Sequence, residues 1–129
     1  MKTIVLHGSP HRAGNSATLA EHFLQGIGAG EVRHFYANEM NIRPCQGCAK
    51  CASRLDHYCA TEDDMQQIYA AFIEADIVVF ATPMYWGYMT AQMKAVMDRM
   101  EAITDHFKGK LQEACALGRT LHTRFESED

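Results

Sequence analysis

Four of the five cysteines are gathered in one short segment, and their spacing suits a metal site. A four-iron cluster needs four convergent thiolates, and zinc accepts the same four ligands in a tetrahedral site. His57, close to the last of these cysteines, could replace one of them as a ligand or simply be solvated. The alternative is a set of free thiols or a facultative disulfide, since a reducing cytosol keeps most thiols free. The candidate metal ligands are Cys45, Cys48, Cys51 and Cys59.

A second candidate site is the polar segment from Gly8 to Ser16, which joins an expected strand to an expected helix. Unsatisfied N–H groups at a helix N-terminus attract anions, and short polar side chains add donors. Arg12 could neutralise a terminal phosphate with its fork of N–H groups. The lysine and glycine spacing of a Walker A loop are missing, and the alternative is a turn that only caps the helix. The candidate phosphate-binding residues are Ser9, Arg12, Asn15, Ser16, Ala17 and Thr18.

A third candidate is the aromatic segment that follows the most apolar run of the chain. A flat heteroaromatic ligand could lie against it, with backbone N–H groups reaching ring nitrogens and carbonyls. A contact between subunits or a place in the core is the alternative, because aromatic residues are also enriched at interfaces. The candidate ring-binding residues are Pro83, Met84, Tyr85, Trp86 and Gly87.

The elements that must position these segments are three strands alternating with three helices. Short apolar runs predict strands over 3–7, 31–37 and 77–81. Apolar residues at helical spacing predict helices from 15 to 27, from 65 to 73 and from about 90 onward. The stripe of the third helix is Met89, Met93, Val96, Met97, Met100 and Ile103, which could form core or bury surface in a subunit contact.

This alternation is typical of an α/β fold with a parallel sheet covered by helices on both faces. Ligands of such sheets bind at the carboxyl ends of the strands. Both the polar and the aromatic segments directly follow strands, so we expect them at the same rim. A phosphate-binding loop beside a platform for a ring describes a mononucleotide site.

Three separated motifs, in this order, resemble those of NADPH-dependent FMN reductases, a family of flavodoxin-like fold that includes the iron–sulfur flavoproteins. The first is the segment Ile4–Ser16. The second is Pro44 with the four cysteines and Asp63-Asp64-Met65. The third is the segment Ala75–Trp86 with Lys94 and Asp98-Arg99. The resemblance covers residues 1 to about 110. It implies a three-layer α/β/α fold, with FMN phosphate on residues 9–18 and the isoalloxazine ring against residues 83–87. It also implies homodimers, NAD(P)H as the hydride donor and a small electron acceptor such as a quinone or flavin.

The chain departs from the resembled family after the third helix. A flavodoxin-like sheet has five strands, and only three are predicted here. We therefore expect one domain over residues 1–129, with a core of 1–108, a divergent tail of 109–129 and a fold truncated after the third strand and its helix. In the tail, Leu111, Ala114, Cys115, Leu121 and Phe125 indicate a weak amphipathic helix.

The truncation would leave one edge of strand 77–81 without a partner, and exposed apolar edges promote association. We expect a second subunit, as a homodimer or higher homo-oligomer, or the tail, to cover this edge. Three functions stay open. They are an FMN-dependent NAD(P)H oxidoreductase, an iron–sulfur flavoprotein that carries electrons, and a shortened non-enzymatic relative that acts as a binding or assembly partner.

Composition narrows the class of protein. The chain has 129 residues, 47% hydrophobic and 22% charged, which is ordinary for one globular domain. The net charge is −4 and the 12 Lys and Arg residues are scattered, which argues against a nucleic-acid partner. The longest apolar run, 77–81, is too short to span a membrane, and the N-terminus is too short for a secretory signal. We expect a cytoplasmic protein.

Overall fold

The computed structural model describes residues 1–56 and 58–104. The predicted tail of 109–129, with its weak helix and Cys115, and the candidate ligand His57 lie outside the described residues. Within them, the three strands of a parallel sheet and three α-helices alternate along the chain, as the hydrophobic pattern predicts, and two further short strands precede the third helix. None of the described helices is both long and apolar enough to pass through a bilayer.

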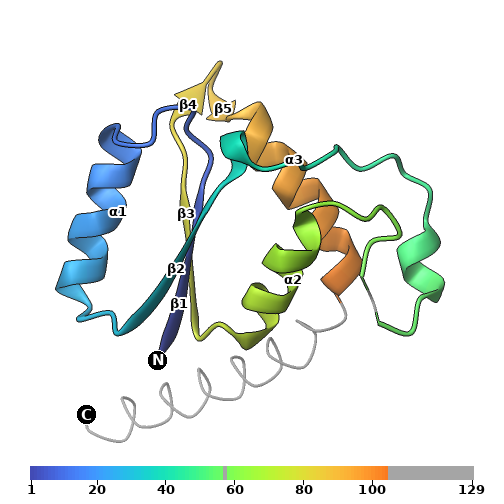
Figure 1. Cartoon of the computed structure of the whole chain (residues 1–129). Coiled ribbons are helices and arrows are strands. Elements are labelled where there is room, and N and C mark those ends of the chain that lie inside the picture. Colours follow the sequence, from blue (N-terminus) through green and yellow to red (C-terminus); the bar gives the residue numbers. More distant parts are fainter. Residues whose placement is uncertain (57, 105–129) are drawn as a thin grey trace, which may run out of the picture.

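The three long strands form one parallel sheet at the centre of the molecule (Figure 1). They are β1 (Lys2–His7), β2 (Glu31–Tyr36) and β3 (Ile77–Ala81), and their order is β2-β1-β3. Strand β1 lies in the middle and is almost wholly buried, which suits its run of apolar and β-branched residues. The order 2-1-3 is that of the first three strands of a flavodoxin-like sheet, so the predicted fold class is confirmed.

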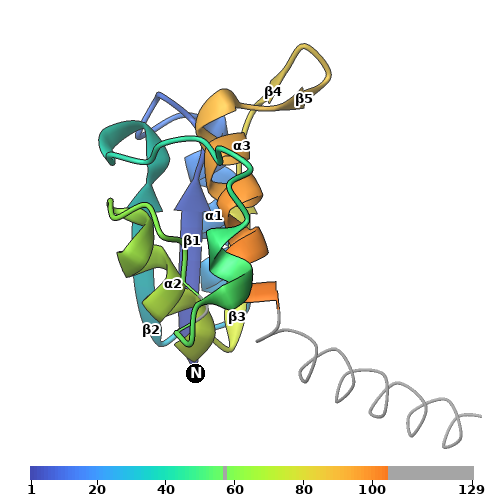
Figure 2. The same ribbon diagram turned by 90° about the vertical axis from the view of Figure 1, so that its right-hand side faces the viewer.

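The helices cover the two faces of the sheet (Figure 2). Helix α1 (Asn15–Gly26) packs Ala20 and Leu24 against Val5 of β1 on one face. Helices α2 (Met65–Glu74) and α3 (Ala91–Arg99) lie on the other face and enclose a larger core with Ile4 and Leu6. Successive residues of β1 therefore point to opposite layers, as the two-residue period of a strand requires.

The stripe predicted for the third helix runs through α3 into a 3₁₀ turn, η3 (Met100–Ile103), and belongs to this larger core. Met93, Val96 and Ile103 are buried, and Met97 and Met100 pack against them while partly exposed. The structure thus places Met93, Val96 and Ile103 in the core, and a subunit contact for the partly exposed methionines stays a prediction.

The aromatic segment differs from the loop that the sequence predicts. Strands β4 (Met84–Tyr85) and β5 (Tyr88–Met89) pair antiparallel and form a small hairpin. Its two turn residues, Trp86 and Gly87, have φ angles of 51° and 74°. Positive φ at both central residues is the geometry of the tight turns that match the twist of a hairpin. Glycine adopts it readily, whereas a tryptophan in this region is strained.

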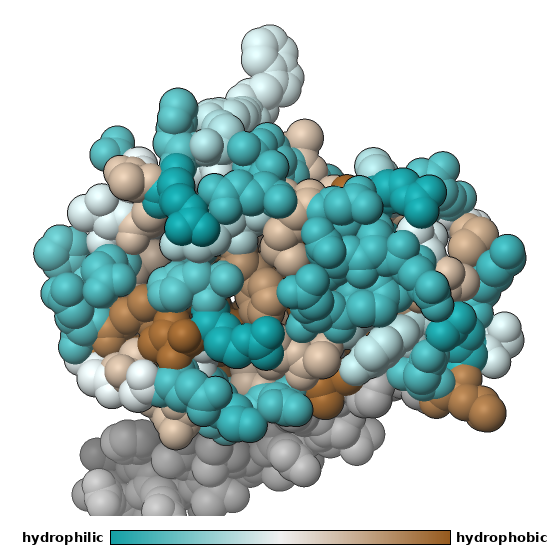
Figure 3. Space-filling view, viewed as in Figure 1, coloured by the Kyte–Doolittle hydropathy of each residue, from teal (hydrophilic) through white to brown (hydrophobic). Residues whose placement is uncertain are grey.

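The two edges of the sheet differ in chemistry. Strand β2 exposes Glu31, Arg33 and His34, and the face of the molecule seen in Figure 3 is mostly hydrophilic. Within residues 1–56 and 58–104, no strand pairs with the outer edge of β3. Beside that edge, Leu19, Phe23 and Phe80 are 71%, 48% and 43% exposed. The predicted apolar edge is therefore present, and what covers it stays a prediction.

Three elements meet closely at Gly8, directly after β1. The Gly8 N–H donates to the Ala81 carbonyl oxygen (2.8 Å), and the Thr90 hydroxyl donates to the Gly8 carbonyl oxygen (2.6 Å). Thr90 also caps α3, since its Oγ1 accepts from the Met93 N–H (3.2 Å). A Cβ on Gly8 would lie 2.8 Å from the Met93 Cβ and 2.9 Å from the hydroxyl oxygens of Thr82 and Thr90.

We predict that Gly8→Ala lowers the free energy of unfolding by about 2 kcal/mol, because an added methyl group overpacks this junction. The matched control is Gly26→Ala, at the end of α1, where an added Cβ meets nothing within 4 Å. That control is expected to raise stability by about 0.5 kcal/mol. Urea unfolding of both variants measures the difference, and equal stability would contradict the packing at Gly8.

Candidate functional site

The polar segment and the aromatic hairpin leave the sheet at the same end (Figure 1). Gly8 begins the polar segment, Thr82 begins the hairpin, and the hydrogen bond from Gly8 to Ala81 holds these two points together. Thr82 and Thr90 lie within 3.5 Å through their hydroxyl oxygens. The rim predicted from the sequence therefore exists, and both segments stand on it.

The N-terminus of α1 has the properties of an anion site. Its cap residue, Gly14, has extended backbone and no side chain, so the helix has no side-chain cap. The first N–H groups of a helix have no acceptor within it, and here they belong to Asn15, Ser16 and Ala17. A Cβ on Gly14 would lie 3.3 Å from the His11 Cβ, so glycine keeps the mouth of this turn open. The residues fit a phosphate group.

The other predicted phosphate ligands have partners inside the chain. The Ser9 Oγ accepts from the His11 N–H (3.0 Å), which leaves its own proton to donate. The Thr18 hydroxyl donates to the Gly14 carbonyl oxygen (3.2 Å) and so turns back onto the helix. Ser9 thus shapes the turn and keeps a donor, while Thr18 braces the cap.

Arg12 lies at the edge of this segment and is engaged by Glu39. Its Nε and Nη2 donate to the two carboxylate oxygens at 3.1 Å each, and its guanidinium lies 3.9 Å from the Tyr36 ring centroid. The hydrogen bonds with Glu39 raise the pKa of Arg12 above its ordinary value. Both side chains are largely exposed, so water and salt screen the pair. A phosphate would have to compete with Glu39 for this cation.

A histidine pair beneath the polar segment was not predicted. His7 is buried at the end of β1, its Nε2 lies 3.0 Å from the His34 Nδ1, and its ring stacks on Tyr36 with centroids 4.4 Å apart. Burial, with the nearby His34 and Arg12, lowers the pKa of His7 from 6.5 to about 4. His7 is therefore neutral at pH 7. The pairing follows from the β1–β2 register, which a single strand pattern does not give.

The hairpin extends from the body, on the β3 side of the molecule (Figure 2). Trp86 is fully exposed, and Met84, Tyr85 and Tyr88 are 48–74% exposed. The alternative of a place in the core is therefore excluded for these four side chains. A ring platform and a subunit contact both remain compatible with their exposure.

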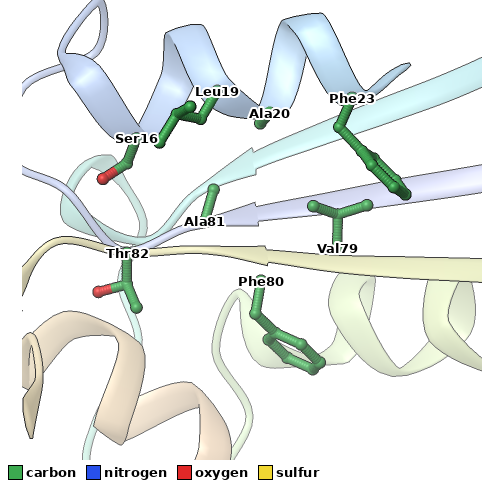
Figure 4. Close-up of a pocket in the computed structure, with 8 residues that line it drawn as sticks. All are labelled: Ser16, Leu19, Ala20, Phe23, Val79, Phe80, Ala81 and Thr82. Carbon is green, nitrogen blue, oxygen red and sulfur yellow. The ribbon is translucent and has the colours of Figure 1, made fainter. Parts of the chain in front are cut away.

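A groove runs between α1 and the open edge of β3, and it reaches Ser16 of the polar segment and Thr82 before the hairpin. Its volume is about 260 Å³, and Figure 4 shows that its walls come from α1 and β3. The hydroxyl groups of Ser16 and Thr82 lie at one end, and the apolar side chains continue away from them. The groove is lined by Ser16, Leu19, Ala20, Phe23, Val79, Phe80, Ala81 and Thr82.

The cysteine segment surrounds a second hollow, of about 240 Å³, on the α3 side of the molecule. Cys45, Cys51 and Cys59 line it together with Asp98 and Arg99. Cys48 is exposed and does not line it, and all four cysteines are free thiols. Among the described residues, no three His, Cys, Asp or Glu side chains are grouped closely enough to hold a metal ion. Three of the predicted ligands thus share one hollow, without forming a closed cage.

A buried ion pair behind this hollow was also not predicted. Arg99, at the end of α3, binds Asp63 through Nη1 (2.7 Å) and Nη2 (3.0 Å), and both side chains are at most 1% exposed. Burial opposes the charge of each partner, but the mutual hydrogen bonds outweigh it, so the pKa of Asp63 is lowered and that of Arg99 raised. Arg99 continues the apolar stripe of Val96 and Ile103 at helical spacing, and this is the signal that could have revealed its burial.

The family model of the NADPH-dependent FMN reductases matches residues 1–122 of the chain. The chain belongs to this family. Membership confirms the resemblance drawn from the three motifs, and it supports FMN and NAD(P)H as the cofactors.

Several curated relatives carry the name iron–sulfur flavoprotein. One from Archaeoglobus fulgidus is 36% identical over 118 residues, which cover 88% of this chain and 60% of the relative. One from Methanocaldococcus jannaschii is 35% identical over 142 residues, covering 97% and 71%. One from Methanosarcina thermophila is 34% identical over 104 residues, covering 77% and 52%. The chain thus spans about half to seven tenths of these relatives, and no solved structure gives a significant match.

We predict that stability falls as the pH drops from 7 to 5, in part because of His7. The unfolded chain binds a proton at His7 near pH 6.5, whereas the folded protein does so only near pH 4. The contribution of His7 is therefore complete above pH 6.5 and lost between pH 6.5 and 4. Between pH 7 and pH 5, the free energy of unfolding of His7→Gln should fall by about 1–2 kcal/mol less than that of the original protein. Urea unfolding at both pH values measures this difference.

The exposed His22 of α1 provides the control for this measurement. His22→Gln should keep the pH dependence of the original protein. If His7→Gln behaves in the same way as His22→Gln, the folded protein does not keep His7 neutral.

Proposed function

We propose that the chain binds FMN at the carboxyl ends of β1 and β3, and that it works as an oxidoreductase. In this function a hydride passes from NAD(P)H to FMN and then to a small acceptor, such as a quinone or a free flavin. The observation that carries the proposal is the hydrogen bond from the Gly8 N–H to the Ala81 carbonyl oxygen (2.8 Å). It joins the starts of the polar segment and the hairpin, and Ser16 of α1 and Thr82 line one groove, which supports neighbouring positions for an anionic tail and a flat ring.

The residues of the chain then have separate roles. The N–H groups of Asn15, Ser16 and Ala17 bind the phosphate, with the hydroxyl of Ser9 as a further donor. The hairpin residues 83–87 lie against the ring and orient it. When bound, FMN supplies the two-electron chemistry, so the protein contributes position and a screened environment and needs no acid–base pair.

The strength of phosphate binding depends on how Arg12 is shared. Arg12 is the one arginine or lysine within residues 8–16, and Glu39 holds its guanidinium. An exposed ion pair is weak, so a dianionic phosphate can displace the carboxylate. Glu39 then acts as a competitor that lowers the affinity for FMN.

A second candidate function is an iron–sulfur flavoprotein that carries single electrons. The names of the relatives favour it, and so does the hollow that Cys45, Cys51 and Cys59 share. Cys48 would complete the set of four thiolates. Since Cys48 lies outside the hollow, the tip of the segment would have to move inward. When bound, a cluster supplies one-electron transfer to the flavin.

The open edge of β3 bears on the oligomeric state of the protein. We propose that a second copy of the chain, or residues 109–129, covers the β3 edge, where Leu19, Phe23 and Phe80 are exposed. Light scattering of the purified protein gives its mass in solution. If the protein is a monomer, and removal of residues 109–129 leaves its solubility unchanged, both forms of this proposal are contradicted.

One experiment separates the candidate functions. The protein is purified without oxygen, and its absorption spectrum is recorded before and after addition of FMN. A flavin spectrum supports the FMN oxidoreductase, and a broad brown absorption with bound iron and sulfide supports the flavoprotein with a cluster. A colourless protein whose thermal midpoint FMN does not change would favour a non-enzymatic relative and contradict the first proposal.

We predict opposite effects for two substitutions on FMN affinity. Arg12→Ala removes the cation and should raise the dissociation constant by roughly tenfold. Glu39→Gln removes the competitor and should lower the dissociation constant. Fluorescence titration with FMN measures both values.

Arg33→Ala is the matched control for this pair. Arg33 is an exposed arginine of β2 and stacks on Phe35, outside the polar segment. The Arg33→Ala variant should bind FMN with the same affinity as the original protein. An Arg12→Ala variant that binds FMN as Arg33→Ala does would show that Arg12 does not contact the phosphate.

A further inference from the structure

The cysteine segment is closed at its base by one buried guanidinium. The Arg99 Nη1 donates to the Arg43 carbonyl oxygen (2.8 Å), and Nη2 donates to the Thr61 carbonyl oxygen (3.0 Å). Arg43 precedes Cys45 by two residues, and Thr61 follows Cys59 by two residues. A side chain of α3 thus holds both ends of the segment that carries the four cysteines.

Asp63 completes this closure from the other side. Its carboxylate accepts the Arg43 N–H (3.0 Å) and the Met65 N–H (3.0 Å), in addition to both Arg99 amino groups. Next to it, Asp64 accepts the Asn41 N–H through Oδ2 (2.7 Å) and donates its own N–H to the Asn41 carbonyl oxygen (3.0 Å). The chain before the cysteines is therefore tied to the chain after them by several charge-assisted hydrogen bonds.

Core packing alone does not explain an ion pair at this position. Arg99 is 2% exposed, at a place in the α3 stripe that an apolar side chain could fill. Taking a cation and a carboxylate out of water is costly, and replacement by apolar residues is often neutral or stabilising. The pair does provide directed hydrogen bonds that an apolar side chain lacks. Those bonds fix where the two ends of the cysteine segment lie.

Arg99 also forms part of the wall of the thiol-lined hollow, beside Cys59. Among the described residues, its Nε–H is buried without a hydrogen-bond acceptor. The Thr61 N–H donates to the Cys59 Sγ at 3.5 Å. Cys59 therefore has a cation and an N–H donor around its sulfur, an environment that suits a thiolate ligand. Hydrogen bonds to ligand sulfurs are one of the means by which proteins set the potential of a metal centre.

The tip of the segment is built differently from the base. Gly47 and Ala49, on either side of Cys48, have φ angles of 65° and 56°. The tip is exposed, and its internal hydrogen bonds join residues only two or three apart. The segment thus has a fixed base, which carries Cys59, and a separate tip, which carries the one thiol outside the hollow.

We propose that Arg99 is the positioning residue of the thiol site: paired with Asp63, it closes the cysteine segment and presents Cys59 to a thiophilic metal centre. This proposal rests on the second candidate function, in which the cysteines hold a metal cluster. It adds the residue on which assembly of that site depends, and this residue lies outside the cysteine motif.

The test uses cobalt(II) as the probe, added to the full-length, reduced protein without oxygen. Cobalt bound by thiolates gives a sulfur-to-metal charge-transfer absorption, which reports coordination directly. In Arg99→Lys, which keeps the charge but loses the fork, the dissociation constant of cobalt should rise at least tenfold and the charge-transfer band should shift. Reconstitution with iron(II) and sulfide should give correspondingly less bound iron per chain.

Arg54→Lys is the matched control. Arg54 lies in the same segment and forms a bidentate pair with Asp56, but this pair is exposed, and the hydrogen bonds of its guanidinium go to Asp56 and not to Arg43, Thr61 or Asp63. Cobalt affinity and the position of the band should equal those of the original protein. Cooperative urea unfolding verifies that each variant is folded. If Arg99→Lys does not fold, Asp63→Asn, which keeps an acceptor for the guanidinium, replaces it.

The outcomes distinguish the two proposals. If the original protein binds neither cobalt nor an iron–sulfur cluster, the second candidate function fails, and the role of Arg99 fails with it. If the original protein binds metal and a folded Arg99→Lys binds it with the same affinity and band, only the role of Arg99 is overturned. A loss confined to the base variants, with Arg54→Lys unchanged, supports the proposal.

Discussion

The close approach of three backbones at Gly8 is the constraint on which the rest of the arrangement depends. At this point β1 ends, β3 ends and α3 begins, and only hydrogen atoms on Cα leave room for the Met93 and threonine side chains. The junction uses the main-chain groups of Gly8 in both directions, toward Ala81 and from Thr90. Because it joins the starts of the polar segment and the hairpin, the geometry of the rim follows from the packing of the core below it.

Charge in the described part of the chain is used mainly to position segments. Arg12 is occupied by Glu39 at the surface, and Arg99 by Asp63 in the interior. The first pair is screened and easily exchanged, which suits a site where an anion arrives and leaves. The second pair is shielded from water and costly to break, which suits a fixed base for a loop. The two arginines thus differ in role because they differ in solvation.

The elements with strong local patterns could be predicted from the sequence. Ile77–Ala81 is a strand with the expected bounds, since β-branched residues lie between Asp76 and the Thr82-Pro83 pair. Helix α2 buries Met65, Ile68, Tyr69 and Phe72, as the helical spacing indicates. These features depend only on neighbouring residues, so a single sequence is enough to predict them.

Features that depend on distant partners could not be predicted in this way. The helical stripe indicates that Arg99 is buried, but its partner Asp63 lies 36 residues earlier in the chain, and no local pattern gives that pairing. The His7–His34 contact depends on strand register, and the hairpin depends on a strained turn residue, Trp86, that propensity disfavours. The common rim could be predicted because it follows from the topology of the parallel sheet. The partners of individual side chains on this rim could not be predicted in the same way.

Because the two edges of the sheet differ, a further strand is expected to add beside β3 and not beside β2. The β2 side presents charged groups to any approaching strand, while the β3 side presents bare peptide groups beside aliphatic and aromatic side chains. A strand added in parallel to β3 would finish at the end of the groove where Ser16 and Thr82 lie. Extending the sheet by one strand would therefore also place a new loop over this end of the groove, so that assembly and enclosure of a ligand there would be a single structural event.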